Sequence, residues 1–416
     1  MRNYPGIDDY SDHDSLEADD EDFYGDNNDN DIDLDDPALE EDEVEADDMD
    51  DEIRMGLRRV DAVAGFFQHN KEPVYTLAMH PTKTHLVLSG GGDDSAFVWN
   101  ADTGESIKEL SKHTDSVVAS GFSHDGTYLA TGGMDGRIFV YTTSTGAQIL
   151  ELDGPAEVTW LTWHPRGNAL LCGSTDGTLW MWNIPSGQCM NVFTGHSSSV
   201  TCGMFTPDGK SIVSGGEDGN LYCWDPKTAA PKTVFRSDDV RFLNGASITS
   251  ISVHHESGAV LAGGQDGNSC LVTLGGNGRI LGSVSKCEDS IESVGFSPQL
   301  SFLKTKVIKN IILNMLVCSL QVGAVSSIDG SIAIWDLDLM RLRQTLRHNK
   351  GVTKVLFLKS SPLLLSCSLD KTVRLWDLRT GRFERAFYGH SGPILDMVAS
   401  QDGERIVSCG EDGSAQ

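Results

Sequence analysis

The residues in this chain whose types could do chemistry together are a histidine, a serine and an aspartate: His196, Ser214 and Asp218. Such side chains can supply a nucleophile, the base that activates it and the carboxylate that orients the base. The same residue types, however, recur at similar spacing along the chain. A catalytic group is needed only once, whereas a structural one is needed in every repeat. The repetition therefore argues against catalysis, and we expect no catalytic residues.

A turn aspartate marks each repeat. It recurs at intervals of 42, 41, 42, 48, 63, 41 and 42 residues, at Asp93, Asp135, Asp176, Asp218, Asp266, Asp329, Asp370 and Asp412. Six residues later, six repeats carry an aromatic residue and the fifth carries Val272; the aromatic residues are Trp99, Tyr141, Trp182, Trp224, Trp335 and Trp376. Twenty-two residues before the aspartate, four repeats carry a histidine: His113, His196, His348 and His390. The chain therefore contains eight repeats.

The elements that must position these residues are short strands. In the repeat from Gly195 to Asp225, the apolar residues Val200, Cys202 and Met204 alternate with others, and the segment 207–209, Pro-Asp-Gly, then turns the chain. Period-two alternation broken by turn residues predicts antiparallel strands joined by hairpins. The 44 glycines of the chain fit many such turns.

The period, the Gly-His pairs and the Trp-Asp pairs (Trp224-Asp225, Trp335-Asp336 and Trp376-Asp377) resemble the WD40 family. In that family each repeat supplies one four-stranded blade of a propeller. The resemblance implies an all-β fold, an eight-bladed WD40 β-propeller with an incomplete last blade, over residues 54–416. It also implies that polar residues of each repeat hydrogen-bond inside the blade as structural tetrads. Their members here are His113, Asp135, His196, Ser214, Asp218, Trp224, His348, Asp370, Trp376, His390 and Asp412.

Several stretches depart from this pattern. In the family, the sequence repeat is offset from the blade, so we expect Val60 to Phe67 to form a strand that pairs with the blade built from Gly389 onward and closes the ring. The third repeat has Gly154 at the histidine position, and we expect its tryptophans to fill the core: Trp160, Trp163, Trp180 and Trp182. The last repeat stops before its aromatic position, which implies either a less stable blade or a truncated sequence.

The sixth repeat contains about 20 additional residues, within 299–321, because Phe296 to Asp329 spans 33 residues where other repeats span 13. Three interpretations remain open: an amphipathic helix that binds a partner, a surface loop, or a retained intervening sequence in the gene model. We favour the last because the insertion interrupts a connection between strands and differs in composition. The segment is too short and too often interrupted by lysine to span a bilayer.

The net charge of -29 is concentrated at the amino terminus. Between Asp8 and Glu52 there are 25 of the 61 acidic residues and no lysine or arginine, so residues 1–52 carry -24 and the remainder carries -5. With so little apolar content we expect residues 1–53 to form a disordered acidic tail. It could act as a self-repelling solubilising arm, or as a polyanion mimic that holds a basic partner. Direct binding of nucleic acid is disfavoured, because like charges repel.

Other classes of protein are disfavoured by what the sequence lacks. Residues 1–52 contain no apolar segment typical of a signal peptide. The nine cysteines include no CxxC pair, so we expect neither a disulfide framework nor a metal site but thiols in a reducing compartment. We expect a cytoplasmic protein that could also enter the nucleus. No nucleophile elbow or phosphate-binding loop is present, so we expect no enzyme and no cofactor.

The long acidic tail followed by eight repeats resembles one subfamily. Segments such as VYTLAMHP, GGGDDSAFVWN and VTCGMFTPDGKSIVSGGEDGNLYCWDPK, within residues 60–415, are similar to the family of the angio-associated migratory cell protein and its fungal counterpart. For the fungal branch, the resemblance implies a dedicated chaperone of a newly made large-subunit ribosomal protein, L-ten in the older naming. The chaperone captures the basic amino-terminal segment of that protein during assembly of the large subunit. For the animal branch it implies a link to cell migration.

Propellers bind partners on the face where the loops before the first strands meet the turns before the aspartates. There we expect an aromatic anchor and seven carboxylates: Tyr75, Asp115, Glu157, Glu217, Glu288, Asp289, Glu292 and Glu411. An acidic rim would attract a peptide rich in lysine and arginine. Alternatively, these carboxylates are ordinary solvated loop residues, and the chain is a general scaffold, a signalling adaptor or a substrate receptor of a ubiquitin ligase. We expect a monomer without a nucleic-acid or membrane partner.

Overall fold

The structure, a computed structural model, describes residues 59–60, 66–68, 72–276, 278–298, 304–308, 311–315, 322–359, 361–400 and 402–416. The chain divides into two units, Met1–Glu52 and Ile53–Gln416. The first unit lies outside the described residues, so the disorder of the acidic tail remains a prediction.

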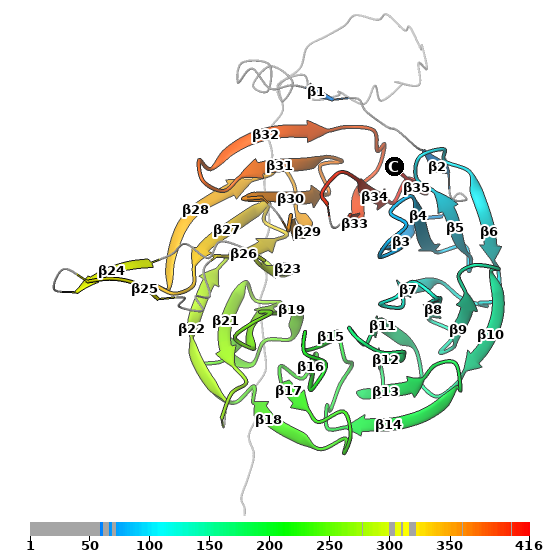
Figure 1. Ribbon diagram of the computed structural model, residues 1–416, viewed down its shortest axis with the longest axis horizontal. Coiled ribbons are helices and arrows are strands. Elements are labelled where there is room, and N and C mark those ends of the chain that lie inside the picture. Colours follow the sequence, from blue (N-terminus) through cyan, green and yellow to red (C-terminus); the bar gives the residue numbers. More distant parts are fainter. Residues whose placement is uncertain are drawn as a thin grey trace, which may run out of the picture. The chain divides into compact units, whose positions relative to one another are not determined.

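The described residues of the second unit form eight blades arranged as a ring (Figure 1). Each blade is a sheet of four antiparallel strands, to which β1 (Arg59–Val60) adds a fifth, parallel strand in blade seven. Blade one contains β3 (Val74–Met79), β4 (Leu86–Gly91), β5 (Ala96–Asn100) and β6 (Ser106–Leu110). Blade two contains β7 (Val117–Phe122), β8 (Tyr128–Gly133), β9 (Ile138–Thr142) and β10 (Ala147–Leu152). Blade three contains β11 (Val158–Trp163), β12 (Ala169–Ser174), β13 (Thr178–Asn183) and β14 (Gln188–Thr194). Blade four contains β15 (Cys202–Phe205), β16 (Ile212–Gly215), β17 (Leu221–Trp224) and β18 (Pro231–Phe235).

The second half of the ring follows the same order. After the 3-10 turn η1 (Leu243–Gly245), blade five contains β19 (Ile248–Val253), β20 (Ala259–Gly264), β21 (Asn268–Thr273) and β22 (Arg279–Lys286). Blade six contains β23 (Ile291–Phe296), β26 (Val322–Ser327), β27 (Ser331–Asp336) and β28 (Arg341–Arg347). Blade seven contains β29 (Val352–Phe357), β30 (Leu363–Ser368), β31 (Val373–Asp377) and β32 (Arg382–Phe387). Blade eight contains β33 (Ile394–Ala399), β34 (Ile406–Gly410), β35 (Ser414–Ala415) and β2 (Phe67–Gln68). The predicted eight-bladed β-propeller is confirmed.

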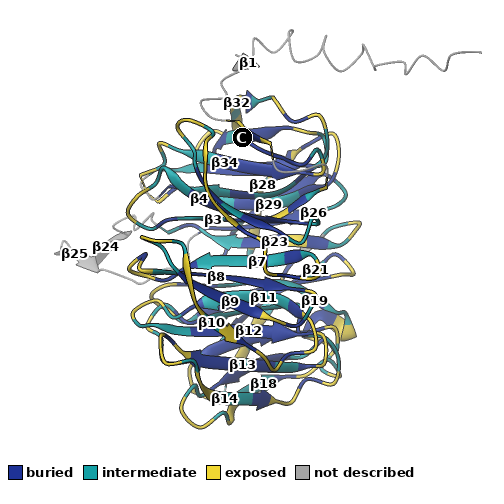
Figure 2. Ribbon diagram, turned by 90° about the vertical axis from the view of Figure 1, so that its right-hand side faces the viewer, coloured by how far each residue is buried: buried dark blue, intermediate teal, exposed yellow. Residues whose placement is uncertain are grey.

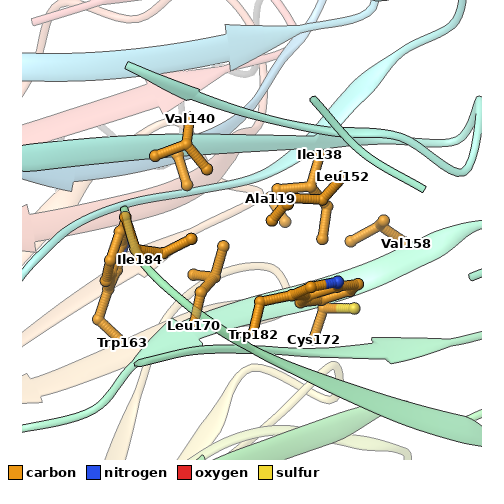
Figure 3. Packing of buried hydrophobic residues seen from close by; sticks show 11 residues of the cluster. Ala119, Ile138, Val140, Leu152, Val158, Trp163, Leu170, Cys172, Trp182 and Ile184 are labelled. Carbon is orange, nitrogen blue, oxygen red and sulfur yellow. The ribbon is translucent and has the colours of Figure 1, made fainter. Parts of the chain in front are cut away.

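The core lies between neighbouring blades. The second and third strands of each blade are buried on both faces, whereas outer strands such as β6 are mostly exposed (Figure 2). Between blades two and three, for example, Ile138 and Val140 face Leu170 and Trp182 (Figure 3). The predicted core tryptophans of blade three lie in the core: Trp163 and Trp182 are buried and Trp180 is half-buried between blades two and three, whereas Trp160 is half-buried against the next core, between blades three and four.

The innermost strands share a β-bulge that links one blade to the next. In seven blades the pairing register shifts at the second residue of this strand, as in β11 between Val158 and Trp160. Where the residue at this position is threonine, its hydroxyl donates to a backbone carbonyl of the following blade. Thr159 bonds the oxygen of Val200 (2.6 Å) and Thr353 that of Ile394 (2.9 Å). Thr201 and Thr249 make the same bonds to Ile248 and Ile291.

The closure of the ring differs in part from the prediction. In the described part of this segment, Phe67–Gln68 pairs with blade eight, antiparallel to Ala415 and Ser414. Residues Arg59–Val60, strand β1, instead pair in parallel with Ala386 and Phe387 of β32 in blade seven. Residues 61–65 between the two pairings lie outside the described residues. The prediction is confirmed for Phe67, which pairs with blade eight, and wrong for Val60, which pairs with blade seven.

The insertion in the sixth repeat is a β-hairpin in its described part. Strands β24 (Lys304–Ile308) and β25 (Ile311–Met315) pair antiparallel with each other and with no other described strand. The amphipathic-helix interpretation is therefore wrong for these residues. The rest of 299–321 lies outside the described residues, and its origin as a retained intervening sequence remains a hypothesis.

Replacing Phe67 by alanine should destabilise the ring at its closure. Phe67 is 7% exposed, and its ring stacks on Trp99 with centroids 5.2 Å apart. Loss of a buried phenylalanine typically costs about 3 kcal/mol of unfolding free energy. The adjacent Phe66 is 49% exposed, so Phe66→Ala is the matched control. Thermal melting should show a clear decrease for Phe67→Ala and almost none for the control; equal decreases would contradict closure by Phe67.

Candidate functional site

The histidine, serine and aspartate found in the sequence meet at one end of blade four. His196 Nδ1 lies 3.0 Å from Asp218 Oδ1, and His196 Nε2 lies 2.9 Å from Ser214 Oγ. An ionised carboxylate only accepts, so Nδ1 carries the proton and the serine hydroxyl donates to Nε2. Trp224 Nε1 donates to Ser214 Oγ at 2.8 Å. We call this chain of hydrogen bonds the clamp.

The clamp recurs in three other blades. In blade seven, His348 contacts Asp370 (2.8 Å) and Ser366 (2.7 Å), and Trp376 donates to Ser366 (2.8 Å). In blades two and eight, the other members also meet: His113 with Asp135 and Thr131, and His390 with Asp412 and Ser408. The sequence analysis missed the hydroxyl in all three of these blades. A signal was present, because Thr131, Ser366 and Ser408 stand four residues before the aspartate, as Ser214 does.

The clamp links serine, histidine and aspartate in the same order as the catalytic triad of a serine hydrolase, but its serine cannot contact a substrate. Ser214 is fully buried, as is the His196 side chain, and the serine oxygen already accepts the indole N–H. A nucleophile must contact the reacting atom, and this one contacts only its own blade. The geometry therefore agrees with the expectation of a structural role.

The aspartate also joins two backbone segments. Asp218 accepts the N–H groups of Ser197, before the first strand, and of Asn220, in the turn before the third strand, both at 3.0 Å. Burial would raise the pKa of Asp218, but hydrogen bonds from His196 and Asn220 outweigh burial and hold the pKa well below its ordinary value. The ionised carboxylate thus fixes the loop to the turn. We call the end of the ring where these loops and turns lie the clamp face.

In blades without the histidine, other residues occupy its position between the loop and the turn. In blade six Cys287 takes its place, since Asp329 accepts the N–H of the next residue, Glu288, at 2.9 Å. The spacing was hidden by the insertion: Cys287 and Asp329 are 42 residues apart instead of 22, a difference of 20. In blade three the ring of Trp180 lies against Gly154, where a Cβ would come within 2.6 Å of it. In blade one, Ser89 Oγ and Trp99 Nε1 have no hydrogen-bond partner, and His69 lies outside the described residues.

The structure places all eight predicted rim residues at the clamp face, and all are exposed. The loops before first strands contain four of them: Asp115, Glu157, Glu288 and Asp289. The turns before the clamp aspartate contain Glu217 and Glu411. The second residue of the innermost strand is Tyr75 in β3 and Glu292 in β23. Loop and turn are held together in each blade by a backbone bond, for example Glu217 N to Ser199 O and Glu411 N to Pro393 O, both 2.9 Å.

The seven carboxylates, which we call the acidic rim, are not neutralised. In the described residues none forms an ion pair with lysine, arginine or histidine. Their short contacts are to neutral donors, such as Ser198 Oγ to Glu217 (2.8 Å) and Ser290 Oγ to Glu292 (2.9 Å). The rim spans blades two, three, four, six and eight, and blade seven interrupts it with exposed Lys350 and Lys371. Such a surface attracts a cationic ligand.

The arrangement offers no site for a metal ion in the part of the chain that the structure describes, where no three metal-ligating side chains gather. What it offers is a rigid ring of loop ends with exposed negative charge.

A serine at the clamp position should contribute far more to stability in a blade where it forms the clamp hydrogen bonds than in a blade where it forms none. Ser366→Ala leaves the buried Trp376 N–H without an acceptor and His348 Nε2 without a donor, at a cost of about 2 kcal/mol of unfolding free energy. Ser89 is its counterpart in blade one and its hydroxyl has no hydrogen-bond partner among the described residues, so Ser89→Ala should change stability by less than about 0.5 kcal/mol. Chemical denaturation of both variants checks this, and equal costs would show that the clamp bonds add nothing.

Two of the clamp histidines, His348 and His113, should make stability depend on pH above the pH range in which the carboxylates titrate. Burial lowers the pKa of His348 and of His113 in the folded protein, although their aspartates oppose this. The unfolded chain therefore binds protons first, so stability decreases as pH falls below about 6.5, by up to about 1.4 kcal/mol per pH unit and histidine.

Melting temperatures at pH values of about 7.5 and 5.5 test this prediction. The unmodified protein should lose more stability between the two pH values than His348→Gln, although the variant starts lower. Equal losses would exclude His348 as a source of the pH dependence.

Comparison with known proteins agrees with this geometry. A family model described as WD domain, G-beta repeat matches residues 62–100, 104–142, 146–183, 187–225, 340–377 and 381–416. The angio-associated migratory cell protein of Homo sapiens is 32% identical over 84% of this chain and 78% of its own length. The ribosome assembly protein SQT1 of Saccharomyces cerevisiae is 23% identical over 88% of each chain.

A solved structure adds a bound partner to these similarities. The crystal structure of Chaetomium thermophilum Sqt1 bound to the N-terminus of the ribosomal protein L10 has a TM-score of 0.75 to this chain and is 28% identical. The match covers 86% of this chain and 99% of that one. With repeats matched over more than half of its length, this chain belongs to the family of WD-repeat propellers that includes the angio-associated migratory cell protein.

Proposed function

We propose that this chain is a non-enzymatic binding protein that captures the basic amino-terminal segment of a large-subunit ribosomal protein of the L10 type. The observation that carries the proposal is the acidic rim: seven exposed carboxylates, without a cation partner in the described residues, on the clamp face. A segment rich in lysine and arginine is the ligand that complements this charge. In this role the chain is a dedicated chaperone in assembly of the large ribosomal subunit.

The relatives support this proposal. The Chaetomium thermophilum protein, whose fold matches over 86% of this chain, was solved with the N-terminus of L10. The yeast relative is a ribosome assembly protein. A newly made ribosomal protein carries positive charge that binds RNA without selectivity, because phosphate contacts dominate such binding. A propeller that covers this charge would keep the segment from other polyanions until assembly, which implies a place of action in the cytoplasm.

The rigidity of the clamp face also favours a binding role. Each rim loop is fixed by backbone bonds and, in blades two, four, seven and eight, by a clamp. A preformed site loses less conformational entropy when a peptide binds than a mobile one does. The buried serine and histidine side chains support the absence of catalysis. Among the described residues there is no helix with the length and apolarity needed to cross a bilayer.

Charge reversal tests the proposal. The full chain is titrated into a labelled synthetic peptide that corresponds to the basic amino-terminal segment of the L10-type protein, with anisotropy as the readout. Glu217→Lys combined with Glu292→Lys should weaken binding about tenfold or more, since two rim carboxylates become repulsive. Binding of the unmodified protein should weaken as salt is added.

The control has the same change of net charge on the opposite end of the ring. Glu105 and Glu404 are exposed in turns at that end, so Glu105→Lys combined with Glu404→Lys should leave affinity almost unchanged. If the two double variants lose affinity equally, only net charge matters and the acidic rim is not the site. If the unmodified protein does not bind the peptide, the proposed function is wrong.

A further inference from the structure

The clamp face is not acidic all round. Three consecutive innermost strands, β33, β3 and β7, carry apolar side chains at the same position, the second residue: Leu395, Tyr75 and Val118. Met134, in the turn before the aspartate of blade two, lies beside them, because its N–H bonds Ser116 O at 3.0 Å in the loop before β7. We call these four residues the apolar arc. Tyr75 and Met134 are 40% and 45% exposed, and the other two are half-buried.

These strands are direct neighbours. Leu77 of β3 donates its backbone N–H to Asp396 Oδ2 of β33 at 2.8 Å, and Thr76 Oγ1 of β3 lies 3.1 Å from Ser120 Oγ of β7. Figure 1 shows β33, β3 and β7 in sequence around the axis of the ring. The apolar arc is therefore contiguous over blades eight, one and two.

The corresponding positions in the other blades have a different chemistry. Thr159, Thr201, Thr249 and Thr353 use their hydroxyls to bond the next blade, and blade six has Glu292. None of these offers an apolar surface. The clamp face thus combines the apolar arc over blades eight, one and two with the acidic rim, whose Glu411 and Asp115 lie in blades eight and two and whose other carboxylates lie in blades three, four and six.

In the part of the chain that the structure describes, Tyr75 and Met134 leave apolar surface exposed to solvent. The ring of Tyr75 lies over Gly92, whose missing side chain leaves the tyrosine uncovered: a Cβ there would come within 3.4 Å of the ring. Apolar surface left in water forgoes about 25 cal/mol per Å², so clustered exposed side chains next to a charged binding rim indicate a contact with a partner.

We propose that the basic segment captured on the acidic rim also carries an aromatic side chain, and that this side chain packs on the apolar arc. The inference rests on the proposed function and adds the contact by which the protein selects one basic segment among many. An aromatic ring fits because Tyr75 offers a ring for stacking and Met134 a thioether that contacts aromatic edges well. The rim then sets the rate of encounter and the salt dependence, and the arc supplies salt-independent affinity.

Two synthetic peptides of equal charge test this inference: a lysine- and arginine-rich peptide with one tryptophan, and its twin with alanine instead. Dissociation constants are measured at about 0.05 M and about 0.5 M salt, where screening differs strongly. The unmodified protein should prefer the tryptophan peptide about tenfold, which corresponds to about 1.4 kcal/mol, and should keep this preference at high salt.

Variants of the apolar arc and of the acidic rim separate the contributions of these two surfaces to binding. Tyr75→Ala with Met134→Ala should abolish the preference, and Tyr75→Phe should keep it. The control, Ile107→Ala with Met190→Ala, removes two apolar residues of outer strands that are 55% and 49% exposed, and it should also keep the preference. Glu217→Lys with Glu292→Lys should weaken both peptides equally and leave the preference intact.

The possible failures are distinguishable. If the protein binds both peptides equally, or if the arc variant keeps the preference, this inference is wrong while capture by the rim stands. If the arc variant weakens both peptides equally, Tyr75 faces a cation rather than an aromatic ring, which also overturns it. If neither peptide binds at low salt, the proposed function fails and this inference with it.

Discussion

The buried hydrogen bonds of the clamp are the constraint on which the rest of this structure depends. A propeller must end each blade with a loop and a turn whose backbone groups would otherwise lie unpaired beside an apolar core, at a cost of one to several kcal/mol each. One ionised aspartate solves this problem by accepting two backbone N–H groups and the histidine, as Asp218 does. Because the histidine is held by the serine, which in turn accepts the N–H of the tryptophan, the loop end is fixed to the middle of the sheet.

A ring tolerates incomplete clamps because its blades are also bound to each other. The clamps are complete in blades four and seven, whereas blade five has neither the histidine nor the tryptophan. There the bulge threonines compensate: Thr201 reaches into blade five and Thr249 leaves it for blade six. At the closure, Asp396 of blade eight bonds both Lys354 of blade seven and the backbone of Leu77 in blade one. Hydrogen bonds within each blade and between neighbouring blades thus both hold the loop ends in place.

Sequence spacing predicts the features that depend on neighbours within one repeat. The eight blades, the clamp pairs and the position of the rim loops all follow from fixed distances along the chain, such as the 22 residues from His196 to Asp218. Features that depend on distant segments were missed. The described residues of the closing segment pair with two different sheets, Arg59–Val60 with blade seven and Phe67–Gln68 with blade eight. Cys287 was hidden by an insertion that lengthens the chain between it and Asp329, although the two segments still lie side by side. Whether a carboxylate has a cation partner likewise depends on contacts across blades.

The second residue of the innermost strand shows how one fold position serves two purposes. The bulge turns this side chain out of the regular ladder, which frees it either to bond the next blade or to face solvent. Threonine takes the first role, as Thr159 does, and strengthens the ring. Tyr75 and Glu292 take the second role and remain exposed. Since the backbone is the same in both cases, binding specificity can change at such positions without loss of the fold. The chemistry of the clamp face is therefore set residue by residue on a frame that the clamps hold constant.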